Sequence, residues 1–141
     1  MRYFIHLSYK GTHYHGWQRQ NNAPTVQAEI EDKISLLLKT PIEILGCGRT
    51  DTGVHAHSYY AHFDIDFDIP QNIEHQLNSI LSENIGVYEV LKSSDEVHAR
   101  FSADERSYRY FIHYQKDPFL LEKSYHYRQS NRPDIDLMNE F

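Results

Sequence analysis

Residues 46–56 read Gly46-Cys47-Gly48-Arg49-Thr50-Asp51-Thr52-Gly53-Val54-His55-Ala56, and they lie between two runs rich in β-forming residues, 42–45 and 58–63. We therefore expect a loop between two strands, with Asp51 at its centre. The glycines let the backbone turn sharply and approach a ligand. A carboxylate presented there can act as a nucleophile or base, and Arg49 can hold an anion or a displaced nucleotide. An isolated Asp-x-Gly is more often a surface turn in which the Asp caps its own backbone.

The segments around this stretch predict strands and helices in alternation. Residues 2–9 alternate apolar and polar side chains, which is the period of a strand. Thr25 can cap a helix that ends before Pro41, and its apolar face carries Val26, Ile30, Ile34, Leu37 and Leu38. The remaining predicted elements are a helix at 73–81 and strands at 86–91 and 106–114.

This order of elements predicts an α+β fold of the ferredoxin-like, split β-α-β type. Its sheet is antiparallel, with two helices packed on one face. The other face of the sheet is then free to bind a partner.

The loop between the first strand and the first helix, residues 10–24, is rich in side chains that stack on bases or hydrogen-bond to them. Gln18, Arg19 and Gln20 are candidate RNA contacts. For Trp17 we expect burial against the core, because tryptophan is usually largely buried, so Arg19 is the expected RNA contact of the two.

Composition and charge indicate one globular domain and no membrane segment. The chain has 141 residues, 40% of them hydrophobic, and one cysteine, Cys47, for which we expect a packing role. The formal net charge is −6, yet residues 1–57 hold six Lys or Arg against five Asp or Glu, while residues 58–141 hold eight against fifteen. RNA phosphates should therefore contact the N-terminal motifs, or basic residues must come from elsewhere. A cytoplasmic enzyme fits this composition.

Four ordered motifs resemble those of one enzyme family. Gly48 to Ala56 resembles the active-site signature of the tRNA pseudouridine synthase A family. The other matching stretches are Tyr9-Lys10-Gly11-Thr12 with Gly16-Trp17-Gln18-Arg19-Gln20, then Thr25-Val26-Gln27, then His98-Ala99-Arg100-Phe101-Ser102-Ala103 with Tyr108-Arg109-Tyr110. Four motifs in the same order are far more specific than a lone Asp-x-Gly.

The resemblance implies an enzyme that isomerises uridine to pseudouridine in the anticodon stem-loop of tRNA. Asp51 matches the essential carboxylate, and whether it attacks the base or the sugar stays open. Tyr108 matches the tyrosine that packs on the uracil, and Arg49 would hold the flipped-out nucleotide. Arg100 and Arg109 join the candidate RNA contacts. The resemblance implies no cofactor and no metal, and it implies a homodimer that binds tRNA.

The resemblance also implies that the chain corresponds to the first half of such an enzyme. We expect a catalytic-motif domain over residues 1–114, followed at 115–141 by an irregular linker and the start of a second half, at Asp134 to Phe141. We expect the chain alone to be inactive or weakly active, because the second half supplies the opposite wall of the cleft in that family.

Two other classes of function remain open. A non-catalytic RNA-binding module would use the free sheet face and its aromatic side chains, but it would not need Asp51. A metal-dependent hydrolase would use Asp51 with His55, His57 and His62, which lie close together in the sequence. We expect no metal there, because structural metal sites usually show a more complete ligand set, and we expect His55 to brace the loop by hydrogen bonding.

Overall fold

A computed structural model describes residues 1–129 and 131–139, and the chain divides into two compact units, Met1–Glu105 and Arg106–Phe141. In the first unit, strands and helices alternate along the chain. Its elements are β1 (Arg2–Tyr9), the 3-10 helix η1 (Gly11–His13), α1 (Val26–Leu38), β2 (Leu45–Gly46), β3 (Ala56–Asp64), α2 (Ile73–Ile80) and β4 (Ile85–Ser93).

Strand β1 is an inner strand of the sheet, and its alternating side chains give it one buried face. Tyr3, Ile5, Leu7 and Tyr9 are buried, and the residues between them are only partly buried. β1 pairs antiparallel with both β3 and β4, and the strand order is β2-β3-β1-β4. This is the order that a β-α-β-β-α-β chain forms in a split β-α-β fold, so the predicted fold class is confirmed.

Helix α1 begins and ends where the sequence predicts. The side chain of Thr25 accepts a hydrogen bond from the N–H of Ala28 at 3.3 Å, which satisfies one of the free donors of the first turn. Val26, Ile30 and Ile34 are fully buried along one face. The helix ends at Leu38, because Lys39 takes the left-handed conformation, with φ 54°.

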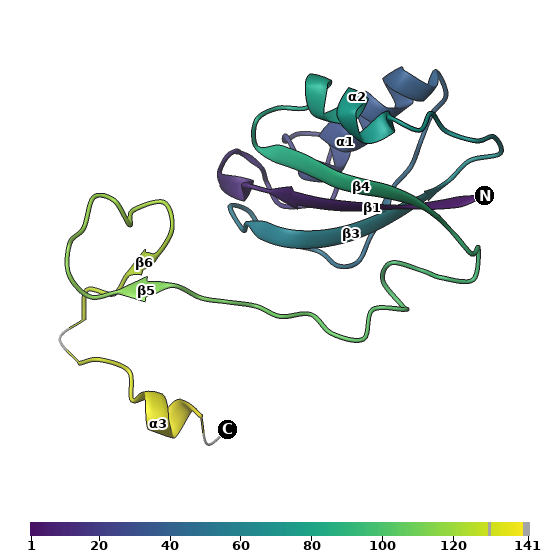
Figure 1. The fold of residues 1–141 in the computed structure, drawn as a ribbon. Coiled ribbons are helices and arrows are strands. Elements are labelled where there is room, and N and C mark those ends of the chain that lie inside the picture. The colour runs from purple at the N-terminus through teal and green to yellow at the C-terminus, as the bar shows by residue number, and fades with distance from the viewer. Residues whose placement is uncertain (130, 140–141) are drawn as a thin grey trace. The chain divides into compact units, whose positions relative to one another are not determined.

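Both helices lie on the same face of the sheet, as Figure 1 shows for the labelled elements. The core fills the space between them and the sheet, with Ile73 and Leu77 of α2 and Phe63 of β3 almost fully buried. Burying one such side chain stabilises the fold by about 1.5–3 kcal/mol, so this layer supplies most of the driving force for folding.

The opposite face of the sheet is partly covered by the segment that follows β4. The N–H of Ala99 donates a hydrogen bond to Nδ1 of His62 at 3.2 Å, and Ala99 is buried. Arg2 ties the same segment to the sheet, because its guanidinium donates to both carboxylate oxygens of Asp64 and to the carbonyls of Asp95 and Val97. The hydrogen bond from Arg2 lowers the pKa of Asp64 and raises that of Arg2.

The strand predicted at residues 42–45 is shorter in the structure, where β2 covers only Leu45–Gly46. The reason lies at Ile44, whose backbone N–H donates to Glu31 and whose carbonyl accepts from Gln27. Side chains of α1 therefore occupy the backbone groups that a longer strand would use.

In the second unit, the predicted strand at 106–114 is wrong except for β5 (Ile112–His113), which pairs parallel with β6 (Tyr125–His126). Alternating side chains are not sufficient for a strand, because the backbone must also find a partner to pair with. The unit also contains α3 (Ile135–Met138), which is capped by Asp134, while Glu140 and Phe141 of the expected second-half start lie outside the described residues.

Candidate active site

Asp51 lies in the loop of residues 47–55 that joins β2 to β3, as the sequence predicts. Asp51 and Arg49 are both exposed. The carbonyl of Asp51 accepts a hydrogen bond from the N–H of Val54 at 3.2 Å, which closes a turn in which Gly53 has φ +80°. Glycine suits that position because other residues rarely adopt such a φ. The turn presents the Asp51 carboxylate and the Arg49 guanidinium on one short loop.

The N-terminal loop holds the backbone of this Asp51 loop. The N–H of Trp17 donates to the carbonyl of Thr50 at 3.1 Å, and the N–H of Gly53 donates to the carbonyl of Tyr14 at 3.3 Å. Gly16 has φ +83°, and a Cβ added there would collide with the carbonyl oxygen of Thr50. The two loops can therefore meet this closely only because residue 16 is a glycine.

Three aromatic side chains form a floor beneath the loop. Trp17 is only 3% exposed, which confirms its predicted burial, and its ring lies 4.2 Å from that of Tyr59 between centroids. The Tyr59 hydroxyl donates to the carbonyl of Gly48, and the hydroxyls of Tyr9 and Thr50 are 2.9 Å apart. Burial raises the pKa of Tyr59, so its hydroxyl stays protonated and can donate.

Tyr14 anchors the N-terminal loop to both helices. Its hydroxyl donates to Oε2 of Glu29 on α1 at 2.6 Å, and Oε1 of Glu29 accepts from the N–H of Ser82, just after α2. Burial and the Glu29 contact raise the pKa of Tyr14 to about 12. Burial opposes ionisation of Glu29, but the hydrogen bonds from Tyr14 and Ser82 outweigh it and lower the pKa of Glu29. A charged acceptor thus fixes Tyr14, whose carbonyl binds the Asp51 loop.

The histidines near Asp51 have separate roles. Nδ1 of His55 accepts a hydrogen bond from the N–H of Gly11 at 2.9 Å, which confirms that His55 braces the loop. His57 is exposed, and His62 is buried on β3 against the ring of His98. Across residues 1–129 and 131–139, no three His, Cys, Asp or Glu side chains are arranged to bind one metal ion.

The candidate RNA contacts are spread over both units. Gln18, Arg19 and Gln20 are exposed on the N-terminal loop, but Arg19 already pairs with Glu31 and Asp32 of α1. Arg100 belongs to the first unit, where its guanidinium carbon lies 5.8 Å from the centre of the Phe101 ring. Tyr108 and Arg109 belong to the second unit and are exposed.

Sequence reasoning missed the residues that support the loop from below. The sequence places Tyr9 in an alternating strand and in the N-terminal motif, and Tyr59 in a β-rich run, but it gives neither hydroxyl a role. Their places on the buried face of β1 and β3 could be read from that alternation, but the contacts of their hydroxyls with Thr50 and Gly48 depend on where the loop folds back. Cys47 packs partly buried against the core, as expected for a small apolar side chain.

The part of the chain described by the structure contains no helix that is long and apolar enough to cross a membrane. Comparison with known proteins identifies the family to which the site belongs. The sequence model of a family described as tRNA pseudouridine synthase matches residues 6–102, which include the Asp51 loop and helices α1 and α2.

Individual relatives carry the same description. A tRNA pseudouridine synthase A of Parabacteroides distasonis is 44% identical over 141 residues, which cover 99% of this chain and 55% of the relative. The tRNA pseudouridine synthase A of Porphyromonas gingivalis is 42% identical over 145 residues, which cover 99% of this chain and 56% of the relative. The tRNA pseudouridine synthase A of Aquifex aeolicus is 38% identical over 136 residues, which cover 94% of this chain and 56% of the relative. The chain spans about half the length of the curated relatives it matches. From its motifs, its fold and this match, the chain belongs to the tRNA pseudouridine synthase family.

Proposed function

We propose that the protein isomerises uridine to pseudouridine in the anticodon stem-loop of tRNA, with Asp51 as the catalytic carboxylate. The observation that carries the proposal is the placement of Asp51, which is exposed on a loop whose neighbours Thr50 and Gly53 are fixed by hydrogen bonds. A reactive group on a rigid support can be held in a productive geometry, and that is a large part of catalysis. Arg49, exposed on the same loop, would hold the displaced nucleotide.

The reaction exchanges one bond to the ribose for another. The bond between C1′ of the ribose and N1 of uracil breaks, the base rotates, and C5 bonds to C1′. C5 then loses its proton and N1 takes one up, so the product is an isomer of the substrate. The carboxylate of Asp51 would act as nucleophile, at the sugar or at the base. Tyr108 would pack on the uracil, and Arg100 and Arg109 would contact the RNA backbone. Extruding the uridine from its stack costs a few kcal/mol, which the contacts of Arg49 and Tyr108 would offset.

The proposal includes the partners of the reaction. The substrate is the anticodon arm of tRNA, the enzyme works in the cytoplasm as a homodimer, and the chemistry requires no cofactor. The weak positive balance of residues 1–57 supports an RNA-facing surface on the N-terminal motifs, because phosphate contacts dominate affinity for nucleic acids.

The test compares Asp51→Asn and Asp51→Ala with wild type. The tRNA is digested to nucleosides, and pseudouridine is separated from uridine, which has the same mass, by liquid chromatography and quantified. The chain is assayed alone and in a fusion protein, in which it is followed by the part of the Parabacteroides distasonis relative beyond the aligned residues. Both substitutions should lower turnover by several orders of magnitude, as for other removed nucleophiles. Asp66→Asn is the control, because Asp66 is an exposed carboxylate outside the loop. Near-normal turnover of the Asp51 variants would overturn the assignment.

One observation favours a second candidate, a non-catalytic RNA-binding module. The rings of His6 and Tyr60 stack 4.5 Å apart on the sheet face away from the helices, and the ring of Tyr88 lies 5.1 Å from His6. Exposed aromatic side chains on a sheet are a common platform for RNA bases. If the wild-type chain and fusion protein bind tRNA but form no pseudouridine, this second function replaces the first.

A further inference from the structure

A buried carboxylate on α1 lies where two loop segments meet. The side chain of Glu31 is only 7% exposed. Its Oε1 accepts hydrogen bonds from the N–H of Ile44 and from Nε2 of Gln27, both at 2.9 Å, and its Oε2 accepts one from Nη1 of Arg19 at 3.1 Å. A buried carboxylate is costly unless hydrogen-bond donors compensate for the lost water. Moving Ile44, Gln27 or Arg19 away from Glu31 is therefore unfavourable, and Glu31 restrains all three donors.

Gln27 lies one helical turn before Glu31 and contacts the same two segments. Its Oε1 accepts from the N–H of Arg19, and its Nε2 also donates to the carbonyl of Ile44, both at 2.9 Å. Its own backbone N–H donates to the carbonyl of Trp17 at 3.0 Å. Side chains and backbone of α1 therefore fix the N-terminal loop at residues 17–19 and the segment that leads into β2. We call Arg19, Gln27, Glu31 and Ile44 the Glu31 network.

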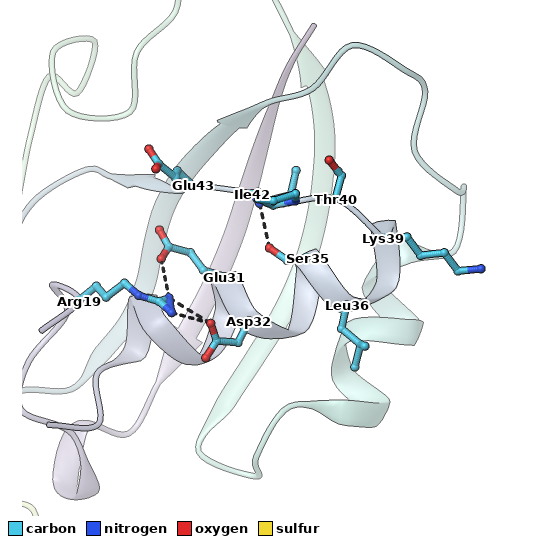
Figure 2. Close-up of a pocket in the computed structure, with 10 residues that line it drawn as sticks. Arg19, Glu31, Asp32, Ser35, Leu36, Lys39, Thr40, Ile42 and Glu43 are labelled. Carbon is cyan, nitrogen blue, oxygen red and sulfur yellow. Dashed lines mark hydrogen bonds and ion pairs between the residues drawn. The ribbon is translucent and has the colours of Figure 1, made fainter. Parts of the chain in front are cut away.

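Figure 2 shows the guanidinium of Arg19 directed at α1, between the carboxylates of Glu31 and Asp32. Its contacts with Oδ1 of Asp32 measure 2.6 and 3.0 Å. The Asp32 side chain is 64% exposed, so water weakens that contact, whereas the Glu31 carboxylate is shielded. Glu31 is therefore the partner that fixes Arg19, and Asp32 offers a matched control.

Both segments held by the Glu31 network are connected to the Asp51 loop, one along the chain and the other by a hydrogen bond. Ile44 is followed by Leu45–Gly46, and a Cβ added to Gly46 would lie 2.7 Å from the indole of Trp17. Trp17 in turn donates its N–H to the carbonyl of Thr50, the residue before Asp51. The loop is thus held at its start and near its centre by residues that Glu31 and Gln27 anchor.

We propose that Glu31 and Arg19 are positioning residues for Asp51, acting through the N-terminal loop and the segment before β2. The proposal rests on the proposed function only for its effect on turnover. Its structural part, that the network orders the Asp51 loop before any RNA binds, stands independently. Neither residue needs to touch the substrate, because a carboxylate displaced by about 1 Å can lose about a hundredfold in rate.

Arg19 is also a candidate RNA contact, and the two roles predict opposite effects of Glu31→Gln. If Arg19 binds a phosphate, removing the competing charge of Glu31 frees the guanidinium and tightens tRNA binding, with kcat unchanged. If the network positions Asp51, the new amide can still accept from Ile44 and Gln27, but its NH₂ group then faces the donors of Arg19. The N-terminal loop loosens, and kcat falls while tRNA binding changes little.

The first experiment measures amide hydrogen exchange by NMR in the full 141-residue chain without RNA. Glu31→Gln and Arg19→Ala should lower the protection of the Trp17, Ile44 and Gly53 amides by about tenfold, as expected for loss of one hydrogen bond to a charged group. Amides of β1 and β4 should keep their protection, which excludes global destabilisation. Asp32→Ala should change none of these amides. Unchanged protection in both network variants overturns the proposal.

The second experiment measures kcat and KM in the fusion protein. Glu31→Gln and Arg19→Ala should lower kcat by about 10- to 100-fold with KM nearly constant. Arg19→Lys should recover most of the rate, because it returns a cation to Glu31, and Asp32→Ala should behave as wild type. Tighter tRNA binding in Glu31→Gln with normal kcat would overturn the positioning role in favour of a phosphate contact. If the wild-type fusion protein forms no pseudouridine, the proposed function fails, and the exchange data still decide whether the network orders the loop.

Discussion

The N–H of Trp17 donates a hydrogen bond to the carbonyl of Thr50 at 3.1 Å, and this contact joins the N-terminal loop to the residue that precedes Asp51. The contact requires that the backbone at residue 16 come very close to Thr50, since a Cβ on Gly16 would collide with that carbonyl. The support of the candidate active site can therefore be tested without changing any residue that would touch a substrate.

Gly16→Ala should destabilise the chain and displace the Asp51 loop. Gly16 has φ +83°, and an added methyl group also meets the Thr50 carbonyl, so strain and collision add. We expect a loss of about 2–4 kcal/mol in the free energy of unfolding, measured by urea denaturation.

The matched control is Gly53→Ala. Gly53 has nearly the same φ, +80°, but an added Cβ would meet nothing within 4 Å. It should cost only the conformational strain, about 1 kcal/mol. If both variants lose the same free energy of unfolding, the close contact between the two loops does not contribute to stability.

Tyr59→Phe should loosen the start of the Asp51 loop. The substitution leaves the buried ring in place but removes the hydroxyl that donates to the carbonyl of Gly48. Losing that bond should cost about 1–2 kcal/mol in urea unfolding. Tyr60→Phe is the control, because Tyr60 is the next residue, faces the other way on β3 and is 45% exposed. If Tyr59→Phe is as stable as Tyr60→Phe, the hydroxyl does not hold the loop.

Local signals in the sequence predicted the elements of the first unit. Thr25 lies three residues before the amide that it caps, so its role needs no knowledge of the rest of the chain. The side-chain alternation in β1 likewise predicted its buried face. Strand length was less predictable, because β2 is shortened at Ile44 by side chains from α1 that lie far away in the sequence.

The candidate site was predictable as a motif but not as a supported structure. The exposed position of Asp51 in a loop between strands follows from the glycines and the flanking β-rich runs. The pairing of Arg19 with Glu31 could not be inferred, because the same arginine on a polar loop is equally suited to a phosphate. The alternation in residues 106–114 predicted a strand that is mostly absent. Alternation reports which way side chains face, and it does not show whether another strand is available to pair with the backbone.

Tyr108→Phe should separate binding from turnover in the fusion protein. If the ring packs on uracil, phenylalanine keeps the stacking surface, so the dissociation constant for tRNA should stay within about twofold of wild type. Turnover should fall, because only the hydroxyl is lost. Tyr110→Phe is the control, since Tyr110 is 88% exposed in the same segment and Tyr108 is 65% exposed. Unchanged turnover in Tyr108→Phe would confine that side chain to packing.

His62 should make the stability of the chain depend on pH above the range in which carboxylates titrate. The imidazole is 1% exposed and packs against Phe4 and His98, with ring centroids 5.5 and 4.6 Å away. Its Nδ1 accepts from the N–H of Ala99, so the neutral form is the one that fits. Burial lowers the pKa of His62 to about 4, and the positive charge of Arg2 and the neighbouring His98 imidazole add to this effect while Asp64 opposes it.

Because the folded state disfavours the protonated imidazole, the unfolded chain takes up the proton first as the pH falls below about 6.5. The contribution of His62 to stability should therefore decrease between pH 6.5 and pH 4 and level off below that. It should account for about 1–2 kcal/mol of loss between pH 7 and pH 5. Urea denaturation of the full chain at pH 7, 6 and 5 measures this loss of stability.

His62→Asn keeps an acceptor near the Ala99 N–H but cannot titrate. Its free energy of unfolding should be lower than that of wild type at pH 7 and nearly constant between pH 7 and pH 5. His57→Asn, at an exposed position next to the same loop, should retain the wild-type slope. If the free energy of unfolding of His62→Asn falls with pH as steeply as that of wild type, another group causes the pH dependence. The neutral form of His62 would then not be what holds the segment after β4.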